Sequence, residues 1–287
     1  LYSLLSLFVF DVFSQRRRAN TSTSTTSEEK SLSLSAMKLR NVGPAFLSGR
    51  IADIAIHPEN DNVWYVATGS SGVWKTENSG TTYTPIFDDE STYSTGCITI
   101  DPNNPSVIWL GTGENVGGRH VAYGDGIFKS EDGGESWKNM GLRKSEHISE
   151  IIIHPDNSDV IWAASQGPLW SPGGERGLYK TIDGGKNWKK VLGGGKWTGV
   201  TDIHLDPRNP DRIYAATWQR HRTVAALMGG GPESGLHRSE DGGESWTELK
   251  SGLPDYAGKI GFTLSPQKPD ILYASIAVSY THPEPTR

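Results

Sequence analysis

Two acidic residues, Glu114 and Glu175, are the candidates for catalysis in this sequence. Both lie in segments that are rich in glycine and also carry arginine. Hydrolysis of a glycosidic bond generally needs two carboxylates on either side of the bond that is cut. The sequence therefore offers an acidic pair of the right chemical type, and the fold decides how far apart the two side chains lie.

The same segments carry side chains suited to recognising a ligand. Arginine forms paired hydrogen bonds with planar acceptors, and tryptophan offers a flat stacking surface. Any one of these residues is equally well explained as a solvated loop residue. Because residues of this kind occur in three separate loops, the loops taken together favour binding. The candidate ligand-binding residues are Arg50, Asn115, Arg119, His120, Tyr123, Trp170, Arg176, Trp218, Arg220, His221 and Arg222.

Other chemistries have no support in the sequence. The His-Glu-x-x-His pattern, paired Cys-x-x-Cys motifs and phosphate-binding glycine loops do not occur, so we expect no metal and no cofactor. The net charge is −5, so the sequence lacks the excess of basic residues that is typical of proteins that bind nucleic acid. The single cysteine, Cys97, lies in an apolar run and is better explained as a buried strand thiol than as a reactive one.

The elements that must position these residues are repeated along the chain. An alternating apolar run that ends in proline occurs five times, and an aromatic residue follows each proline by seven positions. Turn-forming residues fill most of the intervals, so each copy predicts a strand, a tight turn and a second strand. The prolines and their aromatic partners are Pro58 and Tyr65, Pro102 and Trp109, Pro155 and Trp162, Pro207 and Tyr214, and Pro266 and Tyr273.

A second motif, Ser/Thr-x-Asp-x-Gly-x-Ser/Thr-aromatic, follows a third short strand in four of the copies. This is the Asp-box, in which a short carboxylate accepts backbone N–H groups of a turn and a glycine takes the positive φ. We expect its tryptophan to pack between neighbouring repeats. Because the polar groups of each box form hydrogen bonds within the box itself, we favour a structural role for its aspartate over metal binding or catalysis. The residues concerned are Asn78, Asp132, Asp183, Asp241, Trp137, Trp188 and Trp246, and the first copy is degenerate, with Tyr83 in place of tryptophan.

A fourth strand after the aromatic residue, such as residues 83–87, completes a unit of about fifty residues. The prediction is an all-β propeller of four-stranded blades with Asp-box turns, comprising four blades and part of a fifth. A sandwich or solenoid is the alternative. Nearly all variation in length falls between the second and third strands, so these loops mark one face, opposite the Asp-box turns.

The N-terminal segments have a different composition. Residues 1–13 are apolar but too short to span a bilayer, and Ser14 and three arginines follow shortly after. We expect residues 1–14 to be the remnant of a signal peptide, with a truncated strand or a translation artefact as alternatives. Residues 15–37 are then a disordered polar linker, and residues 38–287 an incomplete propeller. A secreted or periplasmic protein with no stable membrane span is expected.

With these repeats, the chain resembles the BNR/Asp-box superfamily, and most of all the bacterial sortilin-like proteins often labelled glycosyl hydrolase. The resemblance covers Lys38 to about Ala277 and depends on KLRNVGPAFLSGRIADIAIHP at the start and on the four boxes. The superfamily includes sialidases, xyloglucanase-type hydrolases and sortilin-type receptors. Arg50 matches the first arginine of the sialidases, but Ala52 replaces their proline. Xyloglucanases carry an aspartate just after the second strand of the first blade, whereas residues 67–72 contain no carboxylate.

Three functions follow from this resemblance and from the loops. The first is a secreted or periplasmic sortilin-like propeller that binds a peptide or glycan on its loop face. The alternative is a glycoside hydrolase of the sialidase or xyloglucanase type that acts on a polysaccharide, with carboxylates from Glu114 and Glu175 or from the missing blades. The third is an assembly or scaffold factor. The expected partners are a peptide or glycan ligand and the remaining blades of the same chain, without nucleic acid.

Overall fold

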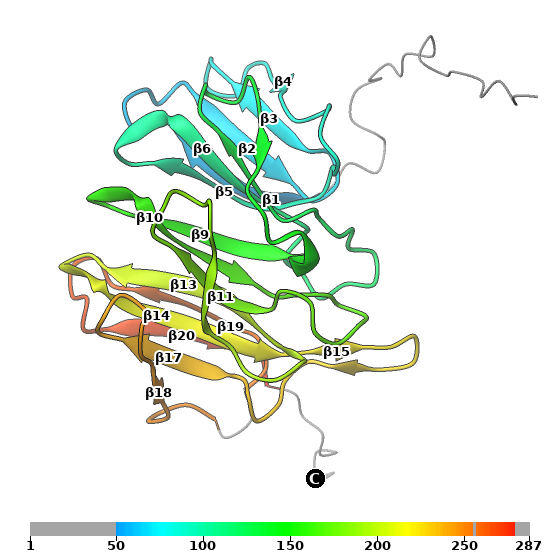
Figure 1. The fold of residues 1–287 in the computed structure, drawn as a ribbon, viewed down its shortest axis with the longest axis vertical. Helices are drawn as coiled ribbons and strands as arrows, with labels where there is room; N and C mark the ends of the chain where they lie inside the picture. Colours follow the sequence, from blue (N-terminus) through cyan, green and yellow to red (C-terminus); the bar gives the residue numbers. More distant parts are fainter. Residues whose placement is uncertain (1–49, 255–256, 279–287) are drawn as a thin grey trace, which may run out of the picture. The chain divides into compact units, whose positions relative to one another are not determined.

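Sheets of the same construction follow one another along the chain (Figure 1). The structure is a computed structural model that describes residues 50–254 and 257–278, all within the unit Val42–Arg287. The expected signal peptide and linker, residues 1–14 and 15–37, lie outside the described residues. Among the described residues, no helix is long and apolar enough to cross a membrane.

Four of the sheets have four antiparallel strands each, in the order in which the strands occur in the chain. The first two sheets comprise β1 (Ile51–Ile56), β2 (Trp64–Thr68), β3 (Val73–Thr76) and β4 (Thr84–Pro85), then β5 (Thr95–Asp101), β6 (Asn104–Thr112), β7 (Ile127–Ser130) and β8 (Lys138–Asn139). The third comprises β9 (Ile148–His154), β10 (Asn157–Ser165), β11 (Gly177–Thr181) and β12 (Lys189–Leu192). The fourth comprises β13 (Thr198–Asp206), β14 (Asn209–Gln219), β17 (Gly235–Ser239) and β18 (Thr247–Leu249).

Three smaller elements complete the described part. The hairpin of β15 (His221–Arg222) and β16 (Leu227–Met228) projects from the loop that follows β14. A 3-10 turn, Arg143–Ser145, precedes the third sheet. The fifth sheet consists, within the described residues, of β19 (Ile260–Leu264) and β20 (Leu272–Ile276). The predicted all-β propeller with four complete blades and part of a fifth is therefore confirmed.

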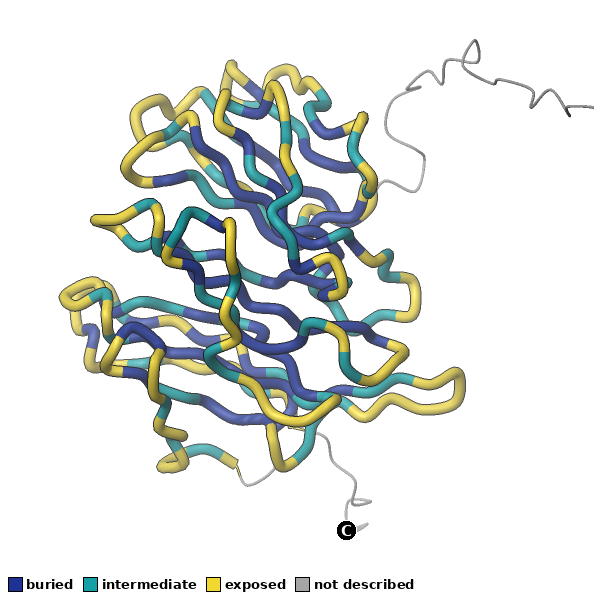
Figure 2. The backbone as a smooth tube through the Cα atoms, in the orientation of Figure 1, coloured by how far each residue is buried: buried dark blue, intermediate teal, exposed yellow. Residues whose placement is uncertain are grey.

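The core lies between consecutive sheets. One cluster joins the first and second sheets through Tyr65, Phe87 and Phe128, and equivalent clusters fill the next three junctions. The middle strands β6, β10 and β14 are buried on both faces over most of their length, because a neighbouring sheet covers each face. Figure 2 shows buried residues running through the strands and exposed residues at the turns.

The fourth strands of the first two sheets are shorter than expected. The sequence predicted a strand over residues 83–87, but β4 spans Thr84–Pro85, and β8 is equally short. These strands form the outer edge of each sheet, where short strands and proline are tolerated because few ladder bonds are required.

Aromatic side chains connect each sheet to its neighbour by hydrogen bonds. The Tyr65 hydroxyl donates to the carbonyl of Gly133 in the second Asp-box, at 3.2 Å, and Trp162 Nε1 donates to Gly242 in the fourth, at 3.2 Å. The equivalent Trp109 instead packs edge-on against Trp188, with 6.4 Å between ring centroids. In the first three sheets, the aromatic residue seven positions after the proline thus contacts a neighbouring sheet.

Bonds in the opposite direction start from the Asp-box tryptophans. Trp137 Nε1 donates to the carbonyl of Ile86 in the preceding sheet, and Trp188 Nε1 donates to Met140, both at 2.8 Å. Each acceptor lies three residues after the aromatic residue of its own box. Trp246 departs from this pattern, because its indole donates to Gly243 within its own turn.

Inner strands are joined by carboxylates at one repeat position, five residues before the proline. Asp53 accepts the amide of Ile98 in the second sheet, and Asp202 accepts the amide of Phe262 in the fifth, both at 2.9 Å. Glu150 has the same position in the third sheet, and burial together with Asp53 and Asp202 raises its pKa to about 8. Cys97 has this position in the second sheet.

Cys97 is buried in the cluster between the second and third sheets. Burial, followed by the nearby carboxylates Glu150 and Asp53, raises the pKa of its thiol well above the ordinary value. A thiol of high pKa carries little thiolate at neutral pH and is a poor nucleophile. Its surroundings are those of a strand thiol in the core.

Candidate functional site

Long connections between the second and third strands gather at one edge of the sheets. They span residues 113–126, 166–176 and 220–234 and are called here the loop face. The β15–β16 hairpin projects at this edge, and the β13–β14 turn lies at the opposite edge (Figure 1). Backbone bonds attach the Asp-box turns to the turns between first and second strands, as from Gly242 to Asp211, so the boxes lie at that opposite edge, called here the box face.

Glu114 is a buried carboxylate that is paired with an arginine. Its side chain is 5% exposed, and Arg50 donates to Oε1 from Nε, at 2.6 Å, and from Nη2. The Glu114 amide donates to the Ser94 hydroxyl at 3.0 Å, and His147 Nδ1 donates to the Glu114 carbonyl at 2.9 Å. Burial lowers the pKa of His147 to about 3, so its ring is neutral at physiological pH. Arg50 thus holds the carboxylate itself, while Ser94 and His147 hold the backbone of the same residue.

The Glu114 carboxylate lies against the backbone of Gly69. A Cβ added to Gly69 would lie 2.7 Å from Glu114 Oε1 and 2.8 Å from Cδ. A side chain at position 69 would therefore collide with this carboxylate. Residues 67–72 contain no acid of their own, and Glu114 from the second sheet supplies one in the same space.

Glu175 has a different set of contacts. Its Oε2 accepts the amide of Lys144 at 2.7 Å, and the Ser165 hydroxyl donates to its carbonyl. These bonds fix the loop 166–176 to the 3-10 turn that precedes the third sheet and to the end of β10. The two candidate carboxylates thus contact different elements, and their shared role in catalysis stays a prediction.

Asn115 is the meeting point of loops from several sheets. Its carbonyl accepts Gln166 Nε2 at 3.1 Å and Lys259 Nζ at 2.9 Å, while its side-chain amide donates to Gly96 at 3.3 Å. Gln166 and Lys259 were not predicted from the sequence. Both are common polar residues outside any motif, and only their positions at a strand end and a strand start mark them.

Arg176 and Arg220 point inward, not toward solvent. Arg176 donates to the carbonyls of Gln166, at 2.7 Å, Ser171, at 2.8 Å, and Pro168. Arg220 donates to Gly167 at 2.8 Å. Burial, and then the charge of Arg176, lowers the pKa of Arg220 to about 9, and burial lowers that of Arg176 to about 10. Both guanidinium groups hold the backbone of one loop, and their contact with a ligand stays a prediction.

The remaining predicted residues of the fourth sheet fix the base of the β15–β16 hairpin. Buried Trp218 donates to the carbonyl of Gly229 at 2.9 Å. His221 stacks on Trp197 with 3.8 Å between ring centroids. Arg222 donates to Gly117 at 2.7 Å and so ties the hairpin to the loop of the second sheet.

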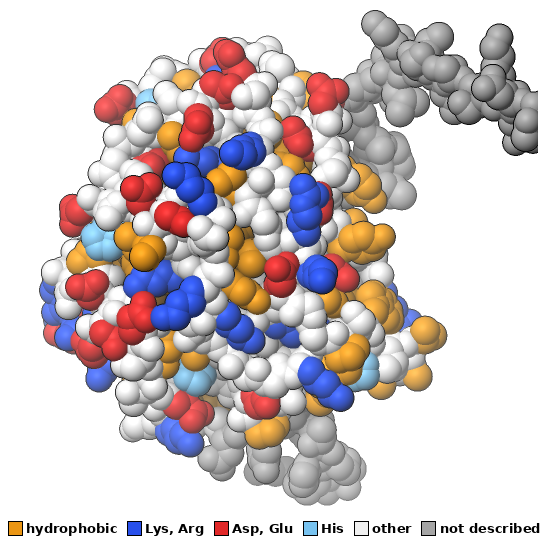
Figure 3. All heavy atoms as spheres, in the orientation of Figure 1, with side chains coloured by type: hydrophobic (Ala, Val, Ile, Leu, Met, Phe, Trp, Pro, Cys, Tyr) orange, Lys and Arg blue, Asp and Glu red, His pale blue; other side chains and the backbone are white. Residues whose placement is uncertain are grey.

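The exposed part of the loop face is aromatic and apolar. Tyr123 is 70% exposed and Trp170 is 45% exposed, and Arg119 and His120 are exposed near Tyr123 in sequence. At the hairpin tip, Val224 is 82% exposed. Figure 3 shows hydrophobic side chains along the edge from which the hairpin projects. Among the described residues, no group of three or more acidic, histidine or cysteine side chains is arranged to hold a metal.

Comparison with known families agrees with this architecture. Residues 125–276 match the family model Sortilin-Vps10, described as sortilin, neurotensin receptor 3. The chain belongs to the Sortilin-Vps10 family. The matched range includes the loops 166–176 and 220–234, whereas Arg50, Glu114 and Tyr123 precede it.

This Sortilin-Vps10 chain is also similar to curated xyloglucanases. It is 24% identical over 246 residues to an oligoxyloglucan-reducing end-specific xyloglucanase of Emericella nidulans, covering 78% of this chain and 27% of that protein. It is 25% identical over 229 residues to the xyloglucanase Xgh74A of Acetivibrio thermocellus, covering 68% and 25%. The chain therefore spans about a quarter of the length of these relatives.

Solved structures support the fold of this Sortilin-Vps10 chain. An ancestral GH74 enzyme aligns with a TM-score of 0.62 at 22% identity, over 79% of this chain and 27% of that one. The GH74 xyloglucanase of Xanthomonas campestris aligns with a TM-score of 0.59 at 17% identity, over 80% and 35%. At these identities the likeness concerns the fold alone.

Proposed function

We propose that this chain is part of a secreted propeller that binds a glycan on its loop face. The observation that carries the proposal is the exposure of Trp170 and Tyr123 on loops whose bases are fixed by buried side chains. An aromatic face matches the apolar face of a sugar ring, while neighbouring arginine and histidine donate to hydroxyl groups. Because the bases are fixed, little conformational freedom is lost when a ligand binds.

The similarity to xyloglucanases suggests the class of glycan. The curated relatives that the chain resembles are named for action on xyloglucan or its oligosaccharides. A xyloglucan oligosaccharide is therefore the first probe, and an unrelated acidic polysaccharide and a peptide library are the comparison ligands.

The test is calorimetric titration of the chain with xyloglucan oligosaccharides. We expect saturable binding that weakens about tenfold, or about 1.4 kcal/mol, in Trp170→Ala and in Tyr123→Ala. Ile182→Ala is the matched control, because Ile182 is 72% exposed but lies in an Asp-box turn. Unchanged binding in both loop variants, or binding of peptides without any glycan, would contradict the proposal.

Hydrolysis is a second candidate function, favoured by the position of Glu114. This carboxylate lies beside Gly69, in the segment where the resemblance to xyloglucanases expects an acid, and it is shielded from solvent. A second carboxylate would come from the remaining blades. Release of reducing ends by the longer protein, abolished in Glu114→Gln and retained in Glu175→Gln, would support hydrolysis. Binding without release would leave recognition as the function.

A further inference from the structure

Two segments lie side by side on the loop face at the junction between the first and second sheets. Residues 86–94 connect β4 to β5, and residues 113–126 form the long loop of the second sheet. Three hydroxyl side chains of the connection donate to the loop. These bonds run from Ser91 to Asp125 at 2.6 Å, from Thr92 to the Tyr123 carbonyl at 3.4 Å, and from Ser94 to the Ala122 carbonyl at 2.8 Å. The two segments therefore hold each other in one register.

The backbone of the connection is also tied to both sheets. The Gly72 amide donates to the Tyr93 carbonyl, and the Gly113 amide donates to the Ser94 carbonyl, both at 2.8 Å. The Ser94 hydroxyl accepts the amide of Glu114 at 3.0 Å. The connection therefore passes directly beside the residue that carries the buried carboxylate.

Two tyrosine side chains are left without a partner by this arrangement. Tyr93 is 61% exposed and Tyr123 is 70% exposed, although hydrogen bonds fix the backbone of each. Within the described part of the chain, neither phenol forms a hydrogen bond or a ring contact. A single exposed tyrosine is ordinary on a protein surface. Two of them on segments that are bonded to each other provide ring faces with polar tips, held at little cost in conformational freedom.

The charges around these tyrosines are mainly negative. Asp89 and Glu90 belong to the connection, and among the described residues no ion pair neutralises either of them. Burial, and then the charge of Asp89, raises the pKa of Glu90. Arg143 is paired with Asp125, and one further arginine, Arg119, is exposed in the loop. A sugar that carries a carboxylate would be repelled by the acids, so the surface favours an uncharged one.

We propose that Tyr93 and Tyr123 form a subsite for an uncharged sugar unit, beside Glu114 on the loop face. The tyrosine rings contact the apolar face of the sugar, and their hydroxyl groups bond to its hydroxyl groups. A peptide strand would need free backbone groups, whereas the carbonyls of Tyr93, Ser94 and Tyr123 are already bonded. The subsite rests on the proposed glycan binding, and it adds Tyr93, which was not predicted from the sequence, to that surface.

The test is calorimetric titration of the chain with a neutral xyloglucan oligosaccharide and with polygalacturonate. Tyr93→Ala should weaken binding of the neutral ligand about tenfold, whereas Tyr93→Phe keeps the ring and should weaken it by no more than about threefold. Tyr83→Ala is the matched control and should not change binding, because Tyr83 is 43% exposed but lies in an Asp-box turn. The wild-type chain should bind polygalacturonate at least about tenfold more weakly than the neutral ligand.

The outcomes separate this proposal from the proposed function. If Trp170→Ala weakens glycan binding and Tyr93→Ala does not, the subsite is wrong while glycan recognition stands. Absence of any glycan binding would refute both. Equal losses in Tyr93→Phe and Tyr93→Ala, or tighter binding of polygalacturonate, would also overturn the subsite. Shifts of the Tyr93 and Tyr123 ring protons in wild-type spectra on addition of the oligosaccharide give a second readout that needs no variant, and unshifted rings at saturation would contradict the proposal.

Discussion

The box face and the loop face of this propeller are stabilised in different ways. On the box face, Asp132 accepts the amide of Ser136 at 2.9 Å and the hydroxyl of Ser130 at 2.7 Å, all within one short turn. On the loop face, Lys259 reaches Asn115 across 144 residues, and Arg222 reaches Gly117 across 105. Local bonds can repeat wherever the motif repeats, whereas long-range bonds occur once and create a surface that is particular to this chain.

This difference separates stability from recognition. Substitutions in the sheets and boxes should lower the free energy of unfolding, and substitutions on the exposed loop face should change binding alone. The effects expected from four substitutions decrease from the core to the loop surface.

The largest effect is expected from Trp162→Ala. Trp162 is 1% exposed in the cluster between the third and fourth sheets and donates to Gly242. Truncation leaves a cavity and should lower the free energy of unfolding by about 3–5 kcal/mol. Urea denaturation followed by circular dichroism measures it. A loss below about 1 kcal/mol would show that the sheets do not depend on this contact.

A smaller effect is expected from Ser130→Ala in the second Asp-box. The buried Ser130 hydroxyl accepts the amide of Gly134 at 2.8 Å, and its loss leaves that buried N–H unpaired. The expected cost is about 1–3 kcal/mol, measured by the same denaturation. Ser130→Thr is the control and should be nearly neutral, because Thr181 makes the same bond to Gly185 in the third box.

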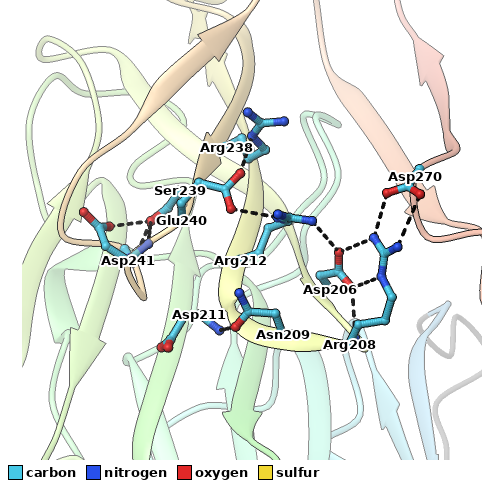
Figure 4. Close-up of polar contacts among 11 residues, drawn as sticks. Asp206, Arg208, Asn209, Asp211, Arg212, Arg238, Ser239, Glu240, Asp241 and Asp270 are labelled. Carbon is cyan, nitrogen blue, oxygen red and sulfur yellow. Dashed lines mark hydrogen bonds and ion pairs between the residues drawn. The ribbon is translucent and has the colours of Figure 1, made fainter.

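Acid should weaken the junction between the fourth and fifth sheets. Arg208 bridges Asp206 of the fourth sheet to Asp270 beside β20 (Figure 4). Hydrogen bonds from Arg208 lower the pKa of Asp206 to about 2, from an ordinary value near 3.8. Because the folded pKa is the lower one, this stabilisation is complete above about pH 4 and is lost as the pH falls through 2. The melting temperature of Asp206→Asn should lie below that of wild type at pH 6, and the two should converge near pH 2. A constant difference would argue against this ion pair.

The smallest effect on stability is expected from Trp170→Ala on the loop face. Because its side chain is 45% exposed, the free energy of unfolding should change by no more than about 0.5 kcal/mol. The same variant should lose affinity for the glycan in the calorimetric titration. A large loss of stability would show that the loop face is a structural element after all.

The sequence predicted the box face in detail because all its determinants lie within a few residues of one another. Five prolines, five aromatic residues and four boxes defined the strands and their order. The shortness of the fourth strands β4 and β8 was missed, since an edge strand needs few ladder bonds and its sequence therefore does not define its length. The loop face was located, but the inward direction of Arg220 and Arg176 was not, because a buried and an exposed arginine look alike in sequence. The contacts of Gln166 and Lys259 with Asn115 could not be predicted, because these residues come together only in the folded structure.

Because of its position, Cys97 can serve as a natural chemical probe of sheet separation. It is the single thiol of the chain and lies between the second and third sheets, shielded from solvent and of raised pKa. A thiol reagent such as a disulfide dye should label it only when those sheets separate. The labelling rate therefore measures how fast the second and third sheets separate, without any engineered probe. A ligand that binds across the loop face should lower this rate.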